Sequence, residues 1–511
     1  MQTRKSKVIF KDYNFNQKLL LPPSLEEMIL SNHPVRVVNQ VVDNLNLDPI
    51  LKKYEGGGCS AYHPRLMLKV IVYGYLTNLY SSRKIEQALQ QNIHFMWLSG
   101  MSYPDHNTIN RFRSERLKGV LKEVFSQVVL LLVDHGHITL KEAYLDGTKI
   151  EANANRYTFV WGKAITRSRD RIKTQLKELW KYAEQVAKEE LEHNEPDSFE
   201  EIDAEKVSQT IEQIDKALEG KEVDKQVKQK LNYAKKNWPD NLKRYDQQEK
   251  QMGDRNSISK TDPDATFMRM KDDHMLNGQL KPGYNWQITT QDQYILGYSL
   301  HQKPNDTTTL PVHLESLKQS LGQLPEVLVA DAGYGSEENY EYLEDNGVEA
   351  YVKFNYFHKE QGKKFRENPA KVENLHYDQK QDCYYCPMGQ KMTFVKETQT
   401  TTANNYKQTK RFYQAQNCKG CPMRGACNKH EGNRMLEVNP RLVGYKQMVR
   451  EKLLSEKGLQ YRSQRPVDVE AVFGNIKYNH NFKRFMLRGL EKVEIEAGLI
   501  SMAHNLRKMA N

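Results

Sequence analysis

The chain has 511 residues, enough for two or more domains, and 28% of them are charged while 38% are hydrophobic. Its mean hydropathy of −0.79 and the lack of any long apolar run exclude a membrane-spanning protein. The N-terminus carries basic residues without an apolar core, which is not the pattern of a signal peptide. The 76 basic and 65 acidic residues give a net charge of +11, which favours polyanionic partners, although solubility alone is the alternative.

Apolar residues at helical spacing predict an all-α domain over residues 1–140, with a bundle in 64–135. A helix from Ile109 to Leu117 carries Arg111 and Arg113. Short helices with tight turns, one of them basic, are typical of a helix-turn-helix DNA reader. We therefore expect a DNA-binding domain in which both arginines contact phosphates. The alternative is a small helical domain with a solvated basic face.

The next informative stretch, residues 143–152, predicts a strand that holds Asp146. A carboxylate inside a strand is costly unless it is paired or binds a metal. The Asp146-Gly147 pair is also a hairpin signal, so a turn is the alternative. Residues 159–254 then become rich in Lys, Glu, Gln and Leu, which indicates an inserted module of long surface helices.

Residues 255–357 return to β character. A hairpin is predicted from Tyr284–Thr290 and Ile295–His301, and a helix follows it. The segment 326–330 then reads as a buried strand that ends at Asp331, before a Gly-rich turn and another helix. Carboxylates at such strand ends lie where open α/β sheets place their ligands.

Without the helical insertion, the order is three strands and then helix, strand, helix, strand. This order predicts a mixed-sheet, ribonuclease H-like α/β core built from residues 141–158, 255–357 and 440–511. The first and fourth strands are neighbours in that fold, so we expect Asp146 and Asp331 to lie side by side.

Residues 358–439 contain two paired-cysteine knuckles, and we expect a small β insertion with a structural Zn²⁺ held by four of five cysteines: Cys383, Cys386, Cys418, Cys421 and Cys427. Cys427 can replace Cys421, or His430 can join the site. The alternative is a set of reduced cysteines in a surface hairpin. The sixth cysteine, Cys59, stands apart and is interpreted as an ordinary thiol.

Near the C-terminus, Pro466 suits the first turn of a helix. Glu470 and Lys477 then share one helical face, whereas Asp468 lies on another face and is the weaker candidate for a third acid. A salt-bridged surface glutamate is the alternative for Glu470. Two strand-end aspartates and this glutamate are suited to holding two Mg²⁺ or Mn²⁺ ions for in-line phosphoryl transfer on DNA.

Tyr461, Arg465, Glu470 and Lys477 resemble the Tyr-Arg-Glu-Lys signature of bacterial insertion-sequence DDE transposases. Asp146 and Asp331 match the first and second acids of that family. The helical N-terminal stretch resembles the InsH-like N-terminal domain, and the cysteine-rich insertion is also similar to one found in that family. The usual signature has two residues between Tyr and Arg and three between Arg and Glu, whereas this chain has three and four. Glu470 and Lys477 keep the usual spacing.

The resemblance implies a transposase that binds element ends, cleaves the phosphodiester backbone and joins 3′-hydroxyl ends to target DNA. Asp146, Asp331 and Glu470 would be catalytic, and Tyr461, Arg465 and Lys477 would contact phosphates. The resemblance also implies a homodimer on paired terminal repeats, which would act with the nucleoid in the bacterial cytoplasm. The alternatives are a nuclease on the same core without strand transfer, and a domesticated, non-catalytic DNA-binding protein.

Overall fold

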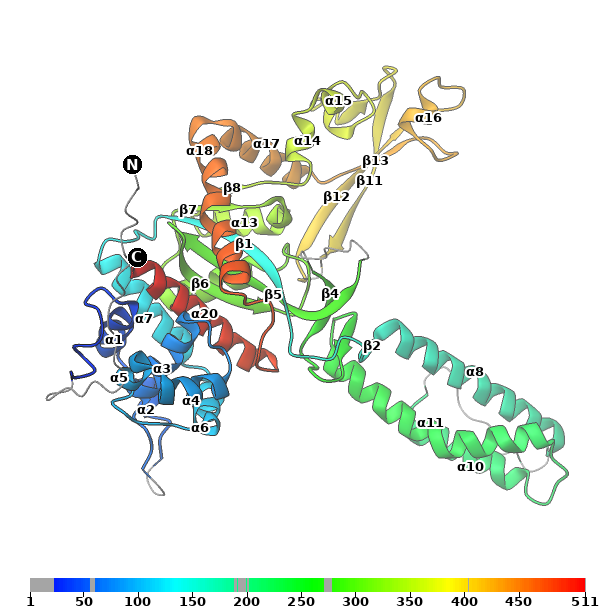
Figure 1. Cartoon of the computed structure of the whole chain (residues 1–511). Helices are drawn as coiled ribbons and strands as arrows, with labels where there is room; N and C mark the ends of the chain where they lie inside the picture. The colour runs from blue at the N-terminus through cyan, green and yellow to red at the C-terminus, as the bar shows by residue number, and fades with distance from the viewer. Residues whose placement is uncertain are drawn as a thin grey trace, which may run out of the picture.

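The computed structural model describes residues 23–55, 60–187, 202–270, 278–402 and 404–510, together with Leu191 and Phe199. Cys59 lies outside these residues. A central body contains the main sheet and the N-terminal helices, and two appendages extend from it (Figure 1). One appendage is the helical insertion, and the other is the β-rich segment that contains the cysteines. Among the described residues, no helix is long and apolar enough to cross a membrane.

The N-terminal region is helical, as predicted. Its helices are α1 (Pro34–Asn44), α2 (Asp48–Leu51), α3 (Pro64–Leu76), α4 (Ser82–Gln91), α5 (Ile93–Leu98), α6 (His106–Arg111) and α7 (Leu121–Asp134). The helix expected from Ile109 to Leu117 is divided, because α6 ends at Arg111 and a π turn, η1 (Phe112–Arg116), follows it. The N-terminal helices pack on α20 (Leu490–Met509) and share one hydrophobic core with the main sheet.

The main sheet is mixed, and its strand order fits a ribonuclease H-like core. Its path is β4 (Thr266–Arg269), β5 (Leu280–Gln291), β1 (Glu142–Glu151), β7 (Val327–Ala330) and β8 (Glu349–Val352), with β6 (Tyr294–His301) also paired to β5. β1 pairs antiparallel with β5 and parallel with β7, and β7 pairs parallel with β8. The first and fourth strands of the predicted core, β1 and β7, are therefore neighbours, as the sequence predicts.

Helices cover both faces of this sheet. Gly297 and Tyr298 are consecutive in β6, so they point to opposite faces. The Cα of Gly297 lies against Leu317 of α12 (Leu310–Leu321), while the Tyr298 ring lies against Gly498 of α20. Next to β7 and β8, α13 (Glu337–Asp345) packs on the outer strand.

The helical insertion has its own hydrophobic core and projects from the body (Figure 1). Its helices are α8 (Gly162–Val186), α10 (Ala204–Ala217) and α11 (Lys225–Met252), and a two-stranded sheet, β2 (Phe159–Trp161) and β3 (Ser257–Ser259), lies at its base. Leu176, Leu179, Ile211 and Ile214 are buried in this core at the helical spacing that the sequence showed.

The cysteine-rich segment forms a five-stranded antiparallel sheet with a small core of its own. Its strands are β9 (His376–Asp378), β10 (Cys383–Tyr385), β11 (Lys391–Thr401), β12 (Lys407–Ala415) and β13 (Met435–Val438), and the short helices α14 (Phe357–Glu360), α15 (Lys363–Arg366) and α16 (Arg424–Cys427) lie around them.

After α17 (Pro440–Leu454), a nearly continuous helical run spans residues 456–479. It consists of α18 (Glu456–Arg465), the π turn η4 (Pro466–Glu470), α19 (Ala471–Gly474) and a second π turn, η5 (Asn475–Asn479). The sequence predicted that Pro466 begins a helix, but this proline lies inside the helical run. Proline lacks an N–H and its ring clashes with the carbonyl four residues earlier, so the helix widens at this point.

Candidate active site at the ends of β1 and β7

Asp146 and Asp331 lie opposite each other across the central parallel strand pair. Leu145 of β1 is in register with Ala330 of β7, so the next pair in the same register is Asp146 and Asp331. Asp331 keeps an extended backbone, with φ −81° and ψ 172°, and so continues the direction of β7. Neighbouring strands are about 4.8 Å apart, and residues in register point to the same face. The strand order thus brings the two predicted acids together.

The Asp146-Gly147 pair lies inside β1 rather than in a turn, so the hairpin alternative is wrong. Gly147 is required by its neighbour, because a Cβ at this position would come within 2.2 Å of the Gln287 Nε2 atom. Gln287 Nε2 donates to Asp306 Oδ1 at 2.9 Å, and the Tyr334 hydroxyl donates to Gln287 Oε1. The absent side chain therefore lets Gln287 tie the turn after Asp331 to the sheet.

Glu470 reaches the same site through Arg465. The Arg465 guanidinium donates to Glu470 Oε1 at 2.6 Å, and its other terminal nitrogen lies 3.1 Å from Asp146 Oδ1. The Arg465 side chain is only 5% exposed, so these two carboxylates hold a charge that is largely removed from water. Arg465 and Glu470 are five residues apart, which is the spacing that a π turn brings onto one face. η4 thus keeps Arg465 and Glu470 on one face although four residues separate them.

Lys353 is a site residue that the sequence reasoning missed. It follows β8, its backbone N–H donates to Ala330 O at 3.2 Å, and its Nζ lies 3.8 Å from Asp331 Oδ1. Burial lowers its pKa, while the charge of Asp331 opposes that shift. Gly335 allows this arrangement, because a Cβ there would meet the Lys353 carbonyl at 2.4 Å. A lysine near the end of the strand that the sequence predicts after the Asp331 helix was the available signal.

Asp468, the weaker candidate for the third acid, points away from the two aspartates. Its carboxylate accepts hydrogen bonds from the Thr290 hydroxyl and from the Gln293 backbone N–H at 3.3 Å. Burial raises the pKa of Asp468. It therefore fastens the C-terminal helix to the β5–β6 turn, and Glu470 remains the candidate for the third acid.

The structure corrects the expected surface position of most predicted phosphate contacts. Arg113 is 3% exposed and donates to the Tyr75 hydroxyl at 3.0 Å and to the Tyr80 carbonyl at 2.8 Å. Tyr461 is also buried, and its hydroxyl donates to Glu142 Oε1 at 2.7 Å. Both residues join segments of the interior. Arg465 and Lys477 are buried as well, and Arg111 is the one of the five predicted contacts that is exposed.

Four of the five clustered cysteines line one small pocket between the turns of the cysteine-rich sheet: Cys386, Cys418, Cys421 and Cys427. Backbone N–H groups donate to the Cys386 and Cys418 sulfurs at 3.3 and 3.4 Å, and Arg434 Nη1 lies 2.8 Å from the Cys427 sulfur. Cys383 is buried in β10 and does not line this pocket.

Within the part of the chain that the structure describes, no three His, Cys, Asp or Glu side chains are gathered closely enough to hold a metal ion as they stand. In the candidate site, cationic side chains lie beside the carboxylates: Arg465 bridges Asp146 and Glu470, and Lys353 adjoins Asp331. The carboxylates can therefore share an ion only after these cations move.

Two family models match the chain. Residues 385–510 match a transposase DDE domain, and residues 23–115 match a transposase domain (DUF772). The first match includes Glu470 but neither Asp146 nor Asp331, and the second covers most of the N-terminal helices. No curated protein matches the chain. The two matches support an insertion-sequence DDE transposase, and the mixed sheet fits the ribonuclease H-like core of such a protein.

Proposed function

We propose that this chain is a DDE transposase that binds the ends of its mobile element, cleaves the DNA backbone and joins 3′-hydroxyl ends to target DNA. The observation that carries the proposal is the register of β1 and β7, which sets Asp146 opposite Asp331 while Arg465 brings Glu470 to Asp146. The matches to two transposase models support the same function.

The three carboxylates fit a site for Mg²⁺ or Mn²⁺ by their chemistry, because hard cations prefer carboxylate oxygens and retain water. Asp331 and Glu470 are half exposed, so water and a DNA strand can reach them. Two divalent ions held there would activate an attacking water or 3′-hydroxyl and stabilise the leaving 3′-oxygen. Asp146, Asp331 and Glu470 are the proposed ligands.

Arg465 and Lys353 supply positive charge beside these acids. In the DNA-free chain they neutralise the carboxylates, since Arg465 bridges two of them and Lys353 adjoins the third. We propose that both turn toward phosphate oxygens when a DNA strand enters. Lys477 is held on the same helical run and remains a proposed phosphate contact, whereas Tyr461 and Arg113 do not.

The cysteine pocket is the proposed structural zinc site, with Cys386, Cys418, Cys421 and Cys427 as ligands. Four thiolates suit tetrahedral Zn²⁺ and leave no open position for catalysis. Backbone N–H groups that donate to Cys386 and Cys418, and the Arg434 guanidinium beside Cys427, contact the sulfurs of this pocket. The proposal also includes domain boundaries at residues 140, 158, 254, 357 and 439. It further includes a dimer on paired element ends and a place with the bacterial nucleoid.

The alternatives are a nuclease on the same core and a non-catalytic DNA-binding protein. A cleavage assay on uncut element ends and a strand-transfer assay on precut ends, both with Mg²⁺, together separate all three. A transposase yields joined product, a nuclease cleaves uncut ends without joining them, and a non-catalytic protein does neither. Cleavage without any joined product would contradict the proposal.

A further inference from the structure

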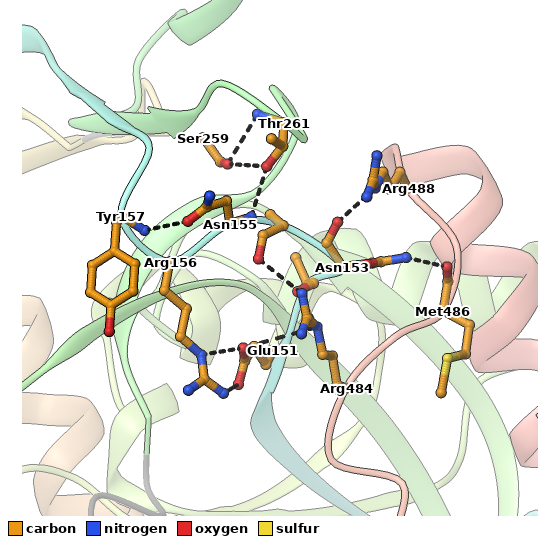
Figure 2. Close-up of polar contacts among 12 residues, drawn as sticks. Glu151, Asn153, Asn155, Arg156, Tyr157, Ser259, Thr261, Arg484, Met486 and Arg488 are labelled. Atoms are coloured by element: carbon orange, nitrogen blue, oxygen red, sulfur yellow. Dashed lines mark hydrogen bonds and ion pairs between the residues drawn. The ribbon is translucent and has the colours of Figure 1, made fainter.

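A basic surface that the proposed active site does not use lies where the chain leaves β1 (Figure 2). It consists of Arg156, Arg484 and Arg488, and we call it the arginine surface. The segment that carries Arg484 and Arg488 runs beside the end of β1: the Glu151 N–H donates to Lys483 O at 3.4 Å, and the Phe485 N–H donates to Glu151 O at 2.9 Å. The surface is thus joined directly to the strand that holds Asp146.

Alternating burial fixes which side chains of this segment face solvent. Phe482, Phe485 and Leu487 are buried, and the two phenylalanine rings pack against Trp286 of β5. The residues that alternate with or follow them, Arg484, Met486 and Arg488, are exposed. The aromatic residues therefore anchor the segment to the sheet and turn its arginines outward.

Backbone carbonyls hold both arginines in place. Arg484 donates to the carbonyls of Ala152 and Ala154 at 3.1 and 2.9 Å, and Arg488 donates to that of Asn153 at 2.8 Å. Carbonyls carry no net charge, so these bonds orient the guanidinium groups without neutralising them. A guanidinium has five N–H donors, which leaves donors on each arginine for another acceptor.

The acidic side chain of this cluster balances only part of the charge. Glu151 receives two hydrogen bonds from Arg156, at 2.7 and 2.8 Å, and lies 4.0 Å from the Arg484 guanidinium. Its carboxylate is 9% exposed, whereas Arg156 and Arg484 are 43% and 44% exposed. These four side chains thus comprise three arginines and one glutamate, while Asp262 and Asp264 accept hydrogen bonds from the backbone N–H groups of Gly489 and Leu490 next to Arg488.

We propose that the arginine surface binds the phosphate backbone of duplex DNA beside the active site; the inference rests on the proposed function. β1 continues for five residues from Asp146 to Glu151, a path of about 17 Å at the strand rise of about 3.4 Å per residue. That path equals roughly five base-pair steps of duplex, at about 3.4 Å each. A duplex lying along β1 would therefore meet the arginine surface about five base pairs from the bond that is cut.

Two observations favour this partner. Arg484 and Arg488 are exposed, unlike Arg113, Tyr461, Arg465 and Lys477, so they can meet a duplex without first being uncovered. Guanidinium groups with fixed orientation also suit phosphate oxygens, which accept paired N–H donors.

The test is the salt dependence of binding by the full-length protein to a fluorescein-labelled duplex of random sequence, between about 50 and 200 mM KCl and without divalent ions. Each lost phosphate contact lowers the slope of log affinity against log salt by about 0.9. Arg484→Gln with Arg488→Gln is expected to lower the slope by about two, and Arg488→Gln alone, which removes only one exposed anchor, by about one.

The matched control is Lys230→Gln with Lys235→Gln, which removes the same charge from lysines already paired at 2.7 Å with Glu178 and Asp215. We expect its slope to equal that of the unaltered protein. An unchanged slope in folded Arg488→Gln and in the double arginine variant would overturn the inference and leave the surface to an acidic protein segment, as would an equal loss in the control. A failure of the unaltered protein to bind duplex in a salt-dependent way would instead count against the proposed function.

Discussion

Arg465 donates to the Glu470 carboxylate at 2.6 Å across five residues of one helix. In a regular α-helix, residues three or four apart are neighbours, so a pair five apart turns away from each other. The π turn η4 restores the contact and places the exposed residue Val467 in the widened turn. The helix thus absorbs one additional residue while keeping Glu470 directed at Asp146.

This geometry predicts how the helix tolerates a deletion. Removing Val467 turns η4 into an ordinary α turn and sets the arginine and the glutamate four residues apart, still on one face. We expect the variant to fold and to retain cleavage of DNA that carries its element ends. Removing Val472, which is buried in α19, rotates every later residue by about 100° and is expected to abolish cleavage. Loss of cleavage in both deletions, with the fold intact, would contradict the role assigned to η4.

Because Arg113 is buried, we expect its substitution to lower the stability of the fold rather than to remove a contact with DNA. The Tyr75 hydroxyl that accepts from Arg113 also donates to the fully buried carboxylate of Glu496, at 3.3 Å. Arg113→Ala leaves that carboxylate without its nearby cation and is expected to cost about 3 kcal/mol. Arg111→Ala, two residues earlier and exposed, should leave the thermal midpoint unchanged while weakening duplex binding. The reverse pattern would restore Arg113 to a DNA-facing role.

The lining of the cysteine pocket predicts which cysteines would bind the proposed zinc. Serine at Cys386, Cys418, Cys421 or Cys427 is expected to lower zinc from about one equivalent per chain toward zero, because a structural site needs all four thiolates. Cys383→Ser is the matched control and should keep its zinc. Metal analysis of the purified proteins gives the readout. Less than one equivalent in the unaltered protein, or loss of zinc in Cys383→Ser, would refute this ligand set.

The sequence predicted the neighbouring aspartates because its order of strands and helices matches a ribonuclease H-like core, in which the first and fourth strands are neighbours. Leu145 and Ala330 confirm that pairing. Sequence spacing also selected Glu470, although it assumed an α-helix that begins at Pro466. The widened turn was not predictable, because proline is far more common at a helix start than within one.

Contacts between distant segments explain the remaining differences. Arg113 seemed to belong to a basic face, but Tyr75 and Glu496 surround it, and Glu496 is 383 residues away in the chain. Lys353 gave only a weak signal, because its partner Asp331 lies on another strand. Local spacing likewise could not show that Cys383 is buried in its strand while Cys386 faces the pocket.

The most direct test of the proposed active site is Mg²⁺-dependent cleavage of element-end DNA by Asp146→Asn, Asp331→Asn and Glu470→Gln, with Asp468→Asn as the matched control. Each of the first three removes one proposed ligand charge while keeping the size of the side chain, so we expect cleavage to be abolished and duplex binding to be kept. Asp468→Asn keeps a hydrogen-bonding group at the β5–β6 turn and should still cleave once it is shown to be folded. Cleavage by any of the first three variants, or its loss in folded Asp468→Asn, would contradict the assignment of Asp146, Asp331 and Glu470 as the catalytic acids.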